Sequence, residues 1–298
     1  MKASSASSVL SALIFFLLIS LPTGAQTPLV ITTEPNAIIW IDDIRRGTTD
    51  ASGKLSLTKV SPGRHSVRVR ANGFKETSAA LVPGRRTLAV KLVPTTDQAE
   101  LLFQQAETAR EKARDESTRQ QAVDLYREAI KLRPAFPAAH VGLARLLMDL
   151  NEFKEAHRQI DAARRARPSY PEASAVEGRI YREEAFDRDA IRSFNRAIRE
   201  GGGVQPEAFV GLAKLYEDKG EYAQAVAEYR KALAQLSDSE PVIYQMLGAA
   251  YERLEKPKEA VVAYEKYLEL APNGSFAAAI RSILKQLKRE AAGEQIIP

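Results

Sequence analysis

Residues 206–240 decide the fold, and they read PEAFVGLAKLYEDKGEYAQAVAEYRKALAQLSDSE. The Ala, Glu, Lys, Leu and Tyr residues of this stretch have helical spacing. Ala213 lies twelve positions before Ala225, and Tyr229 follows four positions later. Two antiparallel helices approach closely only where their side chains are small, and a larger residue then fills the groove beside them. The stretch therefore predicts a packed helix pair.

The same pattern recurs in register with a period of about 34 residues. The pairs of small residues are Ala144 and Ala156, Gly178 and Ala190, Ala213 and Ala225, and Gly248 and Ala260. Four positions after each pair stands the larger residue, which is Ile160, Phe194, Tyr229 and Tyr264 respectively. Pro134, Pro168 and Pro272 close second helices. This pattern resembles the tetratricopeptide repeat, with units expected at 137–170, 171–205, 206–240 and 241–274.

The array, residues 96–290, has two atypical ends. A degenerate unit at 100–136 keeps Ala122, Tyr126 and Ala129, and a longer helix is expected from Leu101 to Thr118. A helix over 275–290 is expected to cap the last apolar face, as solenoids require. A tail of residues 291–298 follows.

The resemblance implies that the first helices of successive units line a concave groove for an extended peptide or a helix. Arg145, Arg179 and Lys214 are the ninth residues of three units, so they predict a basic ladder for an acidic, extended partner. Arg182 and Met148 are placed in the same groove. The alternative is that Asp149, Glu183 and Asp218, four residues further on, pair with these cations along each helix. The ninth position lacks the asparagine of chaperone-binding members, which argues against a chaperone co-receptor.

Residues 26–95 differ in composition and predict a small all-β antiparallel sandwich, because short alternating runs are separated by Pro, Gly, Asn and Asp. Strands are expected near Leu29 to Thr32, Ala37 to Ile41, Lys54 to Leu57, Ser66 to Ala71, Ala79 to Val82 and Leu88 to Leu92.

This segment also resembles the PEGA domain. The resemblance rests on TEPNAIIWID at 33–42, GTT at 47–49, SPGRHSVRV at 61–69 and NGF at 72–74. Asn36 stands where the family motif has Gly, and Asn tolerates the left-handed backbone conformation that the turn requires. The resemblance implies a β-sandwich of bacterial surface and envelope proteins and carries over no catalytic residue.

A candidate surface patch of the β domain comprises Ile38, Trp40, Arg68, Arg70 and Lys91. Ile38 and Trp40 share one face of their strand, opposite the expected core. They either form a docking patch or pack against a neighbouring strand or the following helices. The three cations either form a solvated face or bind an anion. Residues 26–95 hold 11 Lys and Arg against 5 Asp and Glu, so an anionic wall polymer or lipid surface is a second candidate partner.

The first 25 residues predict export. Lys2 precedes an uncharged apolar run of 13 residues from Val9 to Leu21, and Thr23 and Ala25 supply the small residues of a cleavage site. The run is shorter than the about 20 residues that span a bilayer. A cleaved signal peptide is therefore expected, with an uncleaved anchor as the alternative, and the chain is placed in the periplasm or outer envelope. Nucleic acid is then not an expected partner.

The sequence offers little for catalysis. It has no cysteine, and His65, His140 and His157 lack a metal-ligand spacing. Neither a phosphate-binding loop nor a nucleophile elbow is found. No metal or cofactor is expected, and the sequence favours a non-enzymatic scaffold for protein–protein interaction.

Overall fold

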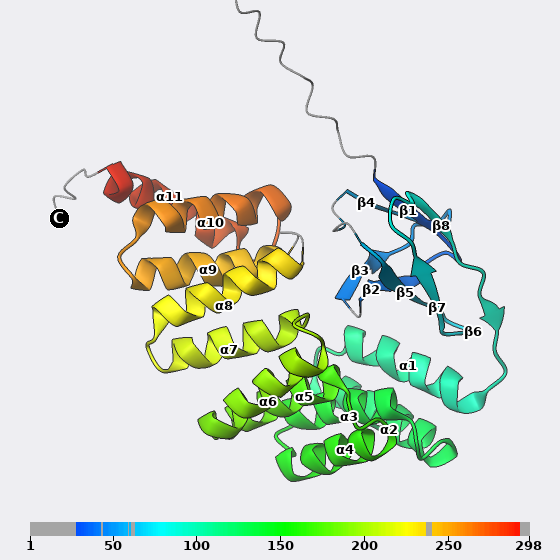
Figure 1. Ribbon diagram of the computed structural model, residues 1–298. Helices are drawn as coiled ribbons and strands as arrows, with labels where there is room; N and C mark the ends of the chain where they lie inside the picture. The colour runs from blue at the N-terminus through cyan, green and yellow to red at the C-terminus, as the bar shows by residue number, and fades with distance from the viewer. Residues whose placement is uncertain (1–27, 43, 59, 61–62, 237–239, 293–298) are drawn as a thin grey trace, which may run out of the picture.

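The computed structural model describes residues 28–292 except 43, 59, 61–62 and 237–239. It shows a small β domain followed by a curved array of antiparallel helix pairs (Figure 1). The predicted signal segment 1–25 and most of the predicted tail lie outside the described residues. Within the described part of the chain, none of the helices has the length and apolar character needed to cross a membrane.

The β domain packs two sheets face to face. One has the strand order β4-β1-β8 and the other the order β3-β2-β5-β7, and β6 pairs with β9 beside them. The strands are β1 Leu29–Thr32, β2 Ile38–Ile41, β3 Ile44–Thr48, β4 Lys54–Leu57, β5 His65–Arg70, β6 Phe74–Lys75, β7 Thr77–Leu81, β8 Thr87–Ala89 and β9 Val93–Pro94. Each expected segment contains a strand, whereas β3, β6 and β9 were not expected.

One pairing differs from the expected antiparallel arrangement. β8 lies parallel to β1, with Ile31 opposite Leu88, because the chain leaves β7 in one sheet and returns along the edge of the other. The core between the sheets follows the predicted period of two, since Ile31, Ile39, Val67 and Val69 are fully buried. Asn36 has φ +56°, which is the left-handed conformation expected at this turn.

The helices follow in antiparallel pairs. They are α1 Gln98–Lys112, α2 Glu116–Leu132, α3 Pro137–Asp149, α4 Phe153–Ala166, α5 Pro171–Glu183, α6 Asp187–Glu200, α7 Pro206–Asp218, α8 Tyr222–Gln235, α9 Pro241–Arg253, α10 Pro257–Leu270 and α11 Ala277–Ala292. Helices α3, α5, α7 and α9 each begin at a proline. Proline is favoured there because the first helical residue needs no backbone N–H and already has a helical φ.

Glycines at the helix crossings explain the close packing of the array. Phe194 is fully buried and lies between Gly178 of its own helix pair and Gly211 of the next. A Cβ atom at Gly178 would lie 2.6 Å from the Phe194 ring, and one at Gly211 would lie 2.3 Å from it. Gly248 receives the Tyr264 ring in the same way. The aromatic side chain therefore fills a space that only glycine leaves open.

The start of the array differs from the expectation. The single helix expected from Leu101 to Thr118 is wrong, because α1 ends at Lys112 and α2 begins at Glu116. Asp115 and Thr118 form a capping box, in which each side chain bonds the backbone of the other residue and starts the new helix. At the other end, α11 buries Ile280, Leu284 and Leu287 against the last pair.

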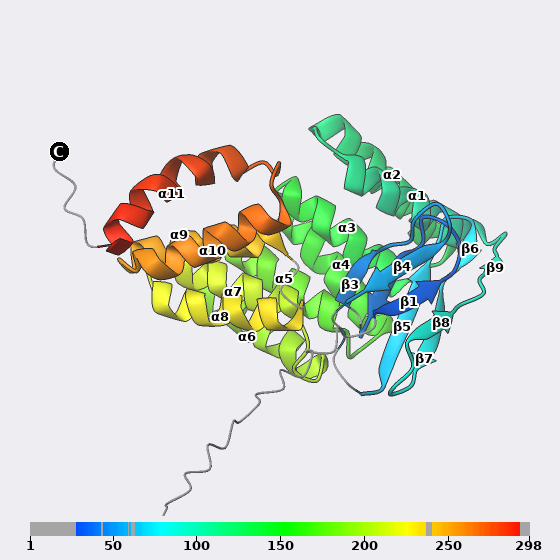
Figure 2. The ribbon, with the colours of Figure 1, turned by 90° about the horizontal axis from the view of Figure 1, so that it is seen from above.

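The β domain lies over α1, above it in Figure 1 and in front of it in Figure 2. The buried Gln104 amide accepts a hydrogen bond from the backbone N–H of Gly73 and donates one to the carbonyl of Phe74, both at 2.8 Å. Arg45 forms an ion pair with Glu111 at 2.8 Å. These contacts hold the β domain beside the first helices of the array.

Candidate functional site

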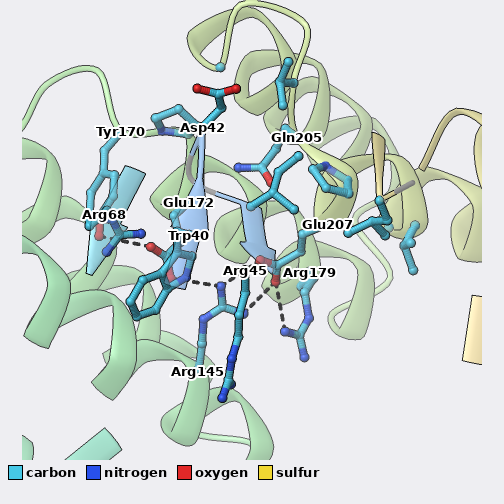
Figure 3. Close-up of a pocket in the computed structure, with 18 of the residues that line it drawn as sticks. Trp40, Asp42, Arg45, Arg68, Arg145, Tyr170, Glu172, Arg179, Gln205 and Glu207 are labelled. Carbon is cyan, nitrogen blue, oxygen red and sulfur yellow. Dashed lines mark hydrogen bonds and ion pairs between the residues drawn. The ribbon is translucent and has the colours of Figure 1, made fainter. Parts of the chain in front are cut away.

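A cavity of about 1000 Å³ lies between the β domain and the first helices of the repeats (Figure 3). The β domain contributes Trp40, Asp42, Arg45 and Arg68, and helices α3, α5, α7 and α9 contribute the facing wall. The cations of that wall are Arg145 on α3, Arg179 and Arg182 on α5, and Lys214 on α7. The expected basic ladder thus lies in one concave site that both domains enclose.

Two of the three ladder cations are paired within the chain. The Glu207 carboxylate, at the start of α7, accepts hydrogen bonds from Arg145 at 2.6 and 2.7 Å and from Arg179 at 3.2 Å. Glu172, at the start of α5, lies 3.3 Å from Arg145. Figure 3 shows Glu207 directed at both guanidinium groups. The ladder is therefore not the row of three available cations that the sequence predicted.

The electrostatics of this bridge follow from its position in the cavity. Burial by itself would raise the pKa of Glu207, but the charges and hydrogen bonds of Arg145 and Arg179 outweigh that effect and lower the pKa to about 2. The pKa of Arg145 is raised, because its attraction to Glu207 and Glu172 outweighs the effect of burial. Both groups stay charged at neutral pH.

The acids expected to neutralise the ladder along each helix are not its main partners. Arg145 pairs with Glu207 and Glu172 of following repeats, and no ion pair between Arg145 and Asp149 occurs among the described residues. Arg182 forms an ion pair with Glu183 and lies 3.9 Å from Asp218. The physical reason is geometric, since the second residue of a unit faces into the cavity and meets the ninth residues of the one or two units before it.

Lys214 is placed differently from the other two ladder cations. It is half-buried, and it forms no hydrogen bond or ion pair with any residue that the structure describes. Burial, together with the nearby charges of Arg182 and Arg179, lowers the pKa of Lys214 below its ordinary value. The second residue of the next unit is Val242, so the glutamate that serves Arg145 and Arg179 has no counterpart here.

Arg182 is the twelfth residue of its unit, a position that holds glutamate in the two following units. In the third and fourth units that residue is Glu217 or Glu252, and it accepts a hydrogen bond from Tyr229 or Tyr264 respectively. In the second unit the packed aromatic is Phe194, which has no hydroxyl, and the twelfth residue is Arg182. The arginine at this position places another cation near Lys214.

Two predicted site residues are corrected by their burial. Met148 is 5% exposed and belongs to the hydrophobic core of the first units, so it presents no groove surface. Arg70 is not part of a solvated face, because it is buried at the contact with α1. Its guanidinium lies 2.8 Å from Glu76, 3.5 Å from Glu107 and 4.6 Å from the Phe103 ring centre.

The rest of the candidate β-domain patch is divided. Trp40 is half-buried, with Arg68 and Arg70 over its ring at 4.3 and 5.0 Å, which fits the alternative of packing within the molecule. Arg68 also pairs with Glu76 at 3.3 Å. Ile38 is half-buried opposite Arg70, and Lys91 is exposed beyond the end of β8. The five residues therefore do not form one open surface.

Glu172 and Glu207 line the cavity but were not predicted as site residues from the sequence. Their signal is the dipeptide Pro-Glu at the same position of two successive units, at 171–172 and 206–207. Among the described residues, no group of three or more His, Cys, Asp or Glu side chains is placed to hold a metal ion. What the arrangement offers is a charged, partly apolar recognition surface.

Comparisons with known proteins agree with this architecture. Tetratricopeptide-repeat family models match residues 113–180 and 205–273. Among solved structures, a thermophilic repeat protein of Thermus thermophilus is 21% identical with a TM-score of 0.53, covering 64% of this chain and 98% of its own. PilF of Pseudomonas aeruginosa is 15% identical with a TM-score of 0.54, covering 66% of this chain and 87% of its own.

These likenesses establish the fold. The chain carries tetratricopeptide repeats behind a small β domain, and its helices form the solenoid that such repeats build. No curated protein matches the sequence.

Proposed function

We propose that this protein is a non-enzymatic scaffold of the bacterial cell envelope that binds a protein partner, as an extended peptide or a helix, in the concave groove of its repeats. The observation that carries this proposal is the cavity between α3, α5, α7, α9 and the β domain. Its volume, about 1000 Å³, is at the upper end of ligand sites, and its lining mixes cations with aliphatic side chains. Such a surface suits a polypeptide segment.

The other function expected from the sequence is binding of an anionic wall polymer or lipid by the basic β domain. It has less support, because Arg68 and Arg70 are engaged with Glu76, Glu107 and Trp40 within the molecule. A polymer would have to displace these contacts. We therefore place the partner in the groove.

The envelope location rests on the predicted signal peptide and on the PEGA-like sequence of the β domain. We expect the mature chain to begin at Gln26, because Thr23 and Ala25 provide the small residues that a signal peptidase requires. N-terminal sequencing of the protein from fractionated cells measures this. Recovery of a chain that retains Met1 in the membrane fraction would favour an uncleaved anchor instead.

The groove proposal is tested by photo-crosslinking in cells. A photoreactive amino acid replaces Val204, which is 37% exposed and lines the cavity, and in a second strain it replaces Val262 on α10, which is 67% exposed and outside the cavity. We expect discrete protein adducts from position 204 and few from position 262. Mass spectrometry of the adducts then identifies the partner.

The comparison between the two positions decides the outcome. Both are exposed valines, so non-specific crosslinking would give similar adducts at the two positions. Adducts from position 262 alone would place the partner on the outer face, and equal adducts at both positions would remove the support for a groove partner.

A further inference from the structure

The chain contains its own example of how a ladder cation is satisfied. The carboxylate of Glu207, the second residue of the third unit, bonds the ninth-residue cations Arg145 and Arg179 of the two units before it. Glu172 has the same place in the second unit and lies 3.3 Å from Arg145. A carboxylate placed like that of Glu172 or Glu207 can therefore pair with a ninth-residue cation.

Lys214 is the next cation of this series, and the second residue of the following unit is not an acid. Glu217 and Glu183 attract Lys214 electrostatically but form no hydrogen bond or ion pair with it among the described residues. The residue in the equivalent place is Val242, which is 43% exposed although it is a large aliphatic side chain. Arg179, Arg182 and Lys214 all line the cavity. Glu207 pairs with Arg145 and Arg179, and Glu183 and Asp218 pair with Arg182, whereas Lys214 forms no ion pair with a described residue.

Aliphatic side chains line the same cavity as this cation. Val242 and Met246 of α9 and Val210 of α7 line the same cavity, and Val204 adds a further exposed side chain. Val242 and Val204 are exposed, and Met246 and Val210 are half-buried, so the cavity that holds this cation offers two kinds of recognition at once. Apolar burial contributes affinity, and the charge-assisted hydrogen bond fixes the position of the ligand.

We propose that Lys214 anchors an acidic side chain of the partner polypeptide and that Val242 and Met246 receive an aliphatic side chain of the same segment. This inference rests on the proposed groove function and specifies its ligand. The partner carboxylate takes the place that Glu207 takes for Arg145 and Arg179. The basic ladder predicted for an acidic, extended partner is thereby reduced to one anchor.

The spacing of the ligand follows from extended geometry. Side chains two residues apart in an extended strand point to the same side and are separated by about 7 Å. Helices that pack directly lie about 8–10 Å apart. Helices α7 and α9 touch less closely than α5 and α7, so their separation is at least of this size, and the long side chains of Lys214 and of the partner's acidic residue span the remainder. A segment with Glu or Asp and an aliphatic residue two positions away therefore matches the two subsites.

The test measures binding of short peptides to the mature chain. The probes are heptapeptides with a central Glu followed two positions later by Val, acetylated and amidated so that no terminal carboxylate is present, and the same peptides with Gln in place of Glu. We expect the Glu peptides to bind about tenfold or more tightly than the Gln peptides. We also expect the difference to shrink as salt is raised.

Two variants locate the site. Lys214→Met keeps the aliphatic stem and removes the charge, and Val242→Glu gives the fourth unit the carboxylate that the second and third units have. Both are expected to weaken the Glu peptides about tenfold or more and to leave the Gln peptides nearly unchanged. Val242→Glu is expected to retain stability, because an acid in the first turn of α9 is favourable.

Matched controls make these losses interpretable. Lys285→Met removes a charge from α11, and Val262→Glu adds one on the outer face of α10, and neither position lines the cavity. Both are expected to bind as the unchanged protein does, and circular-dichroism melts confirm folding of every variant.

The outcomes separate the inference from the proposed function. Equal binding of Glu and Gln peptides, or full binding by Lys214→Met and Val242→Glu, would overturn the Lys214 anchor. If photo-crosslinking still gives adducts from position 204 in that case, the groove function stands without it. If crosslinking gives no adducts there either, both fail.

Discussion

Replacing Phe194 by Ala is expected to lower the free energy of unfolding by about 3–5 kcal/mol. The Phe194 side chain is fully buried and lies against Gly178 of its own helix pair and Gly211 of the next. The two glycines have no side chains that could fill the space that the ring leaves, so the cavity persists. Its free-energy cost is added to that of the lost apolar burial. Urea denaturation followed by circular dichroism measures the change.

The chain offers a matched control in Phe186→Ala. Phe186 stands just before α6, eight residues from Phe194, and is 54% exposed, although it contacts Tyr181 edge-on at 6.4 Å. Its removal is expected to cost less than about 1 kcal/mol. Similar losses for both variants would mean that the ring of Phe194 does not fill the crossing of the second and third units.

Replacing Glu207 by Gln is expected to lower the free energy of unfolding by about 3 kcal/mol, since it leaves Arg145 without its main partner in the cavity. Losses of about 3–5 kcal/mol are usual when one member of a buried pair is removed. The Glu207 side chain retains 29% exposure, so water screens part of the loss and the lower end applies. Glu240→Gln, at an exposed acid lining the same cavity, is the control and is expected to have little effect.

The same carboxylate makes stability depend on pH. Its pKa is lowered from 4.5 to about 2 in the folded protein, so the unfolded chain binds a proton more readily. The contribution of Glu207 is therefore complete above about pH 5 and is lost as the pH falls towards 2, by about 3 kcal/mol in total. The free energy of unfolding of Glu207→Gln is expected to fall less than that of the unchanged protein over this interval. If the free energy of unfolding fell equally with pH in the two proteins, the ion pair of Glu207 with Arg145 and Arg179 would be contradicted.

The sequence predicted most of the fold because the fold depends on periodic patterns. The spacing of Ala213, Ala225 and Tyr229 belongs to a contact between neighbouring helices, so it recurs in the sequence wherever the contact recurs in space. The alternation around Val67 and Val69 likewise follows from a sheet with one buried face. Short strands such as β6, and the break between α1 and α2, depend on single turns and caps that leave no period.

The candidate site was predicted less completely, because its contacts join residues far apart in the sequence. Arg145 and Glu207 are 62 positions apart, and no pattern within one unit connects them. The same holds for Arg70, which lies on a strand and becomes buried only because Phe103 and Glu107 of α1 cover it. Lys214 was predicted as a groove residue, but its difference from Arg145 and Arg179 depends on Val242 in the following unit.

The bridge from α3 to α7 also has a mechanical consequence. Arg145 and Glu207 connect units that are not neighbours, and α5 packs between them against both helices, so these three units resist bending as one stiff segment. Beyond α7 no such connection to α9 occurs among the described residues, and the two helices touch more slightly. At the joint between α7 and α9, helix α9 is held by its packing on α8, so the groove side of the solenoid beside Lys214 lacks the ion-pair brace that the earlier units have.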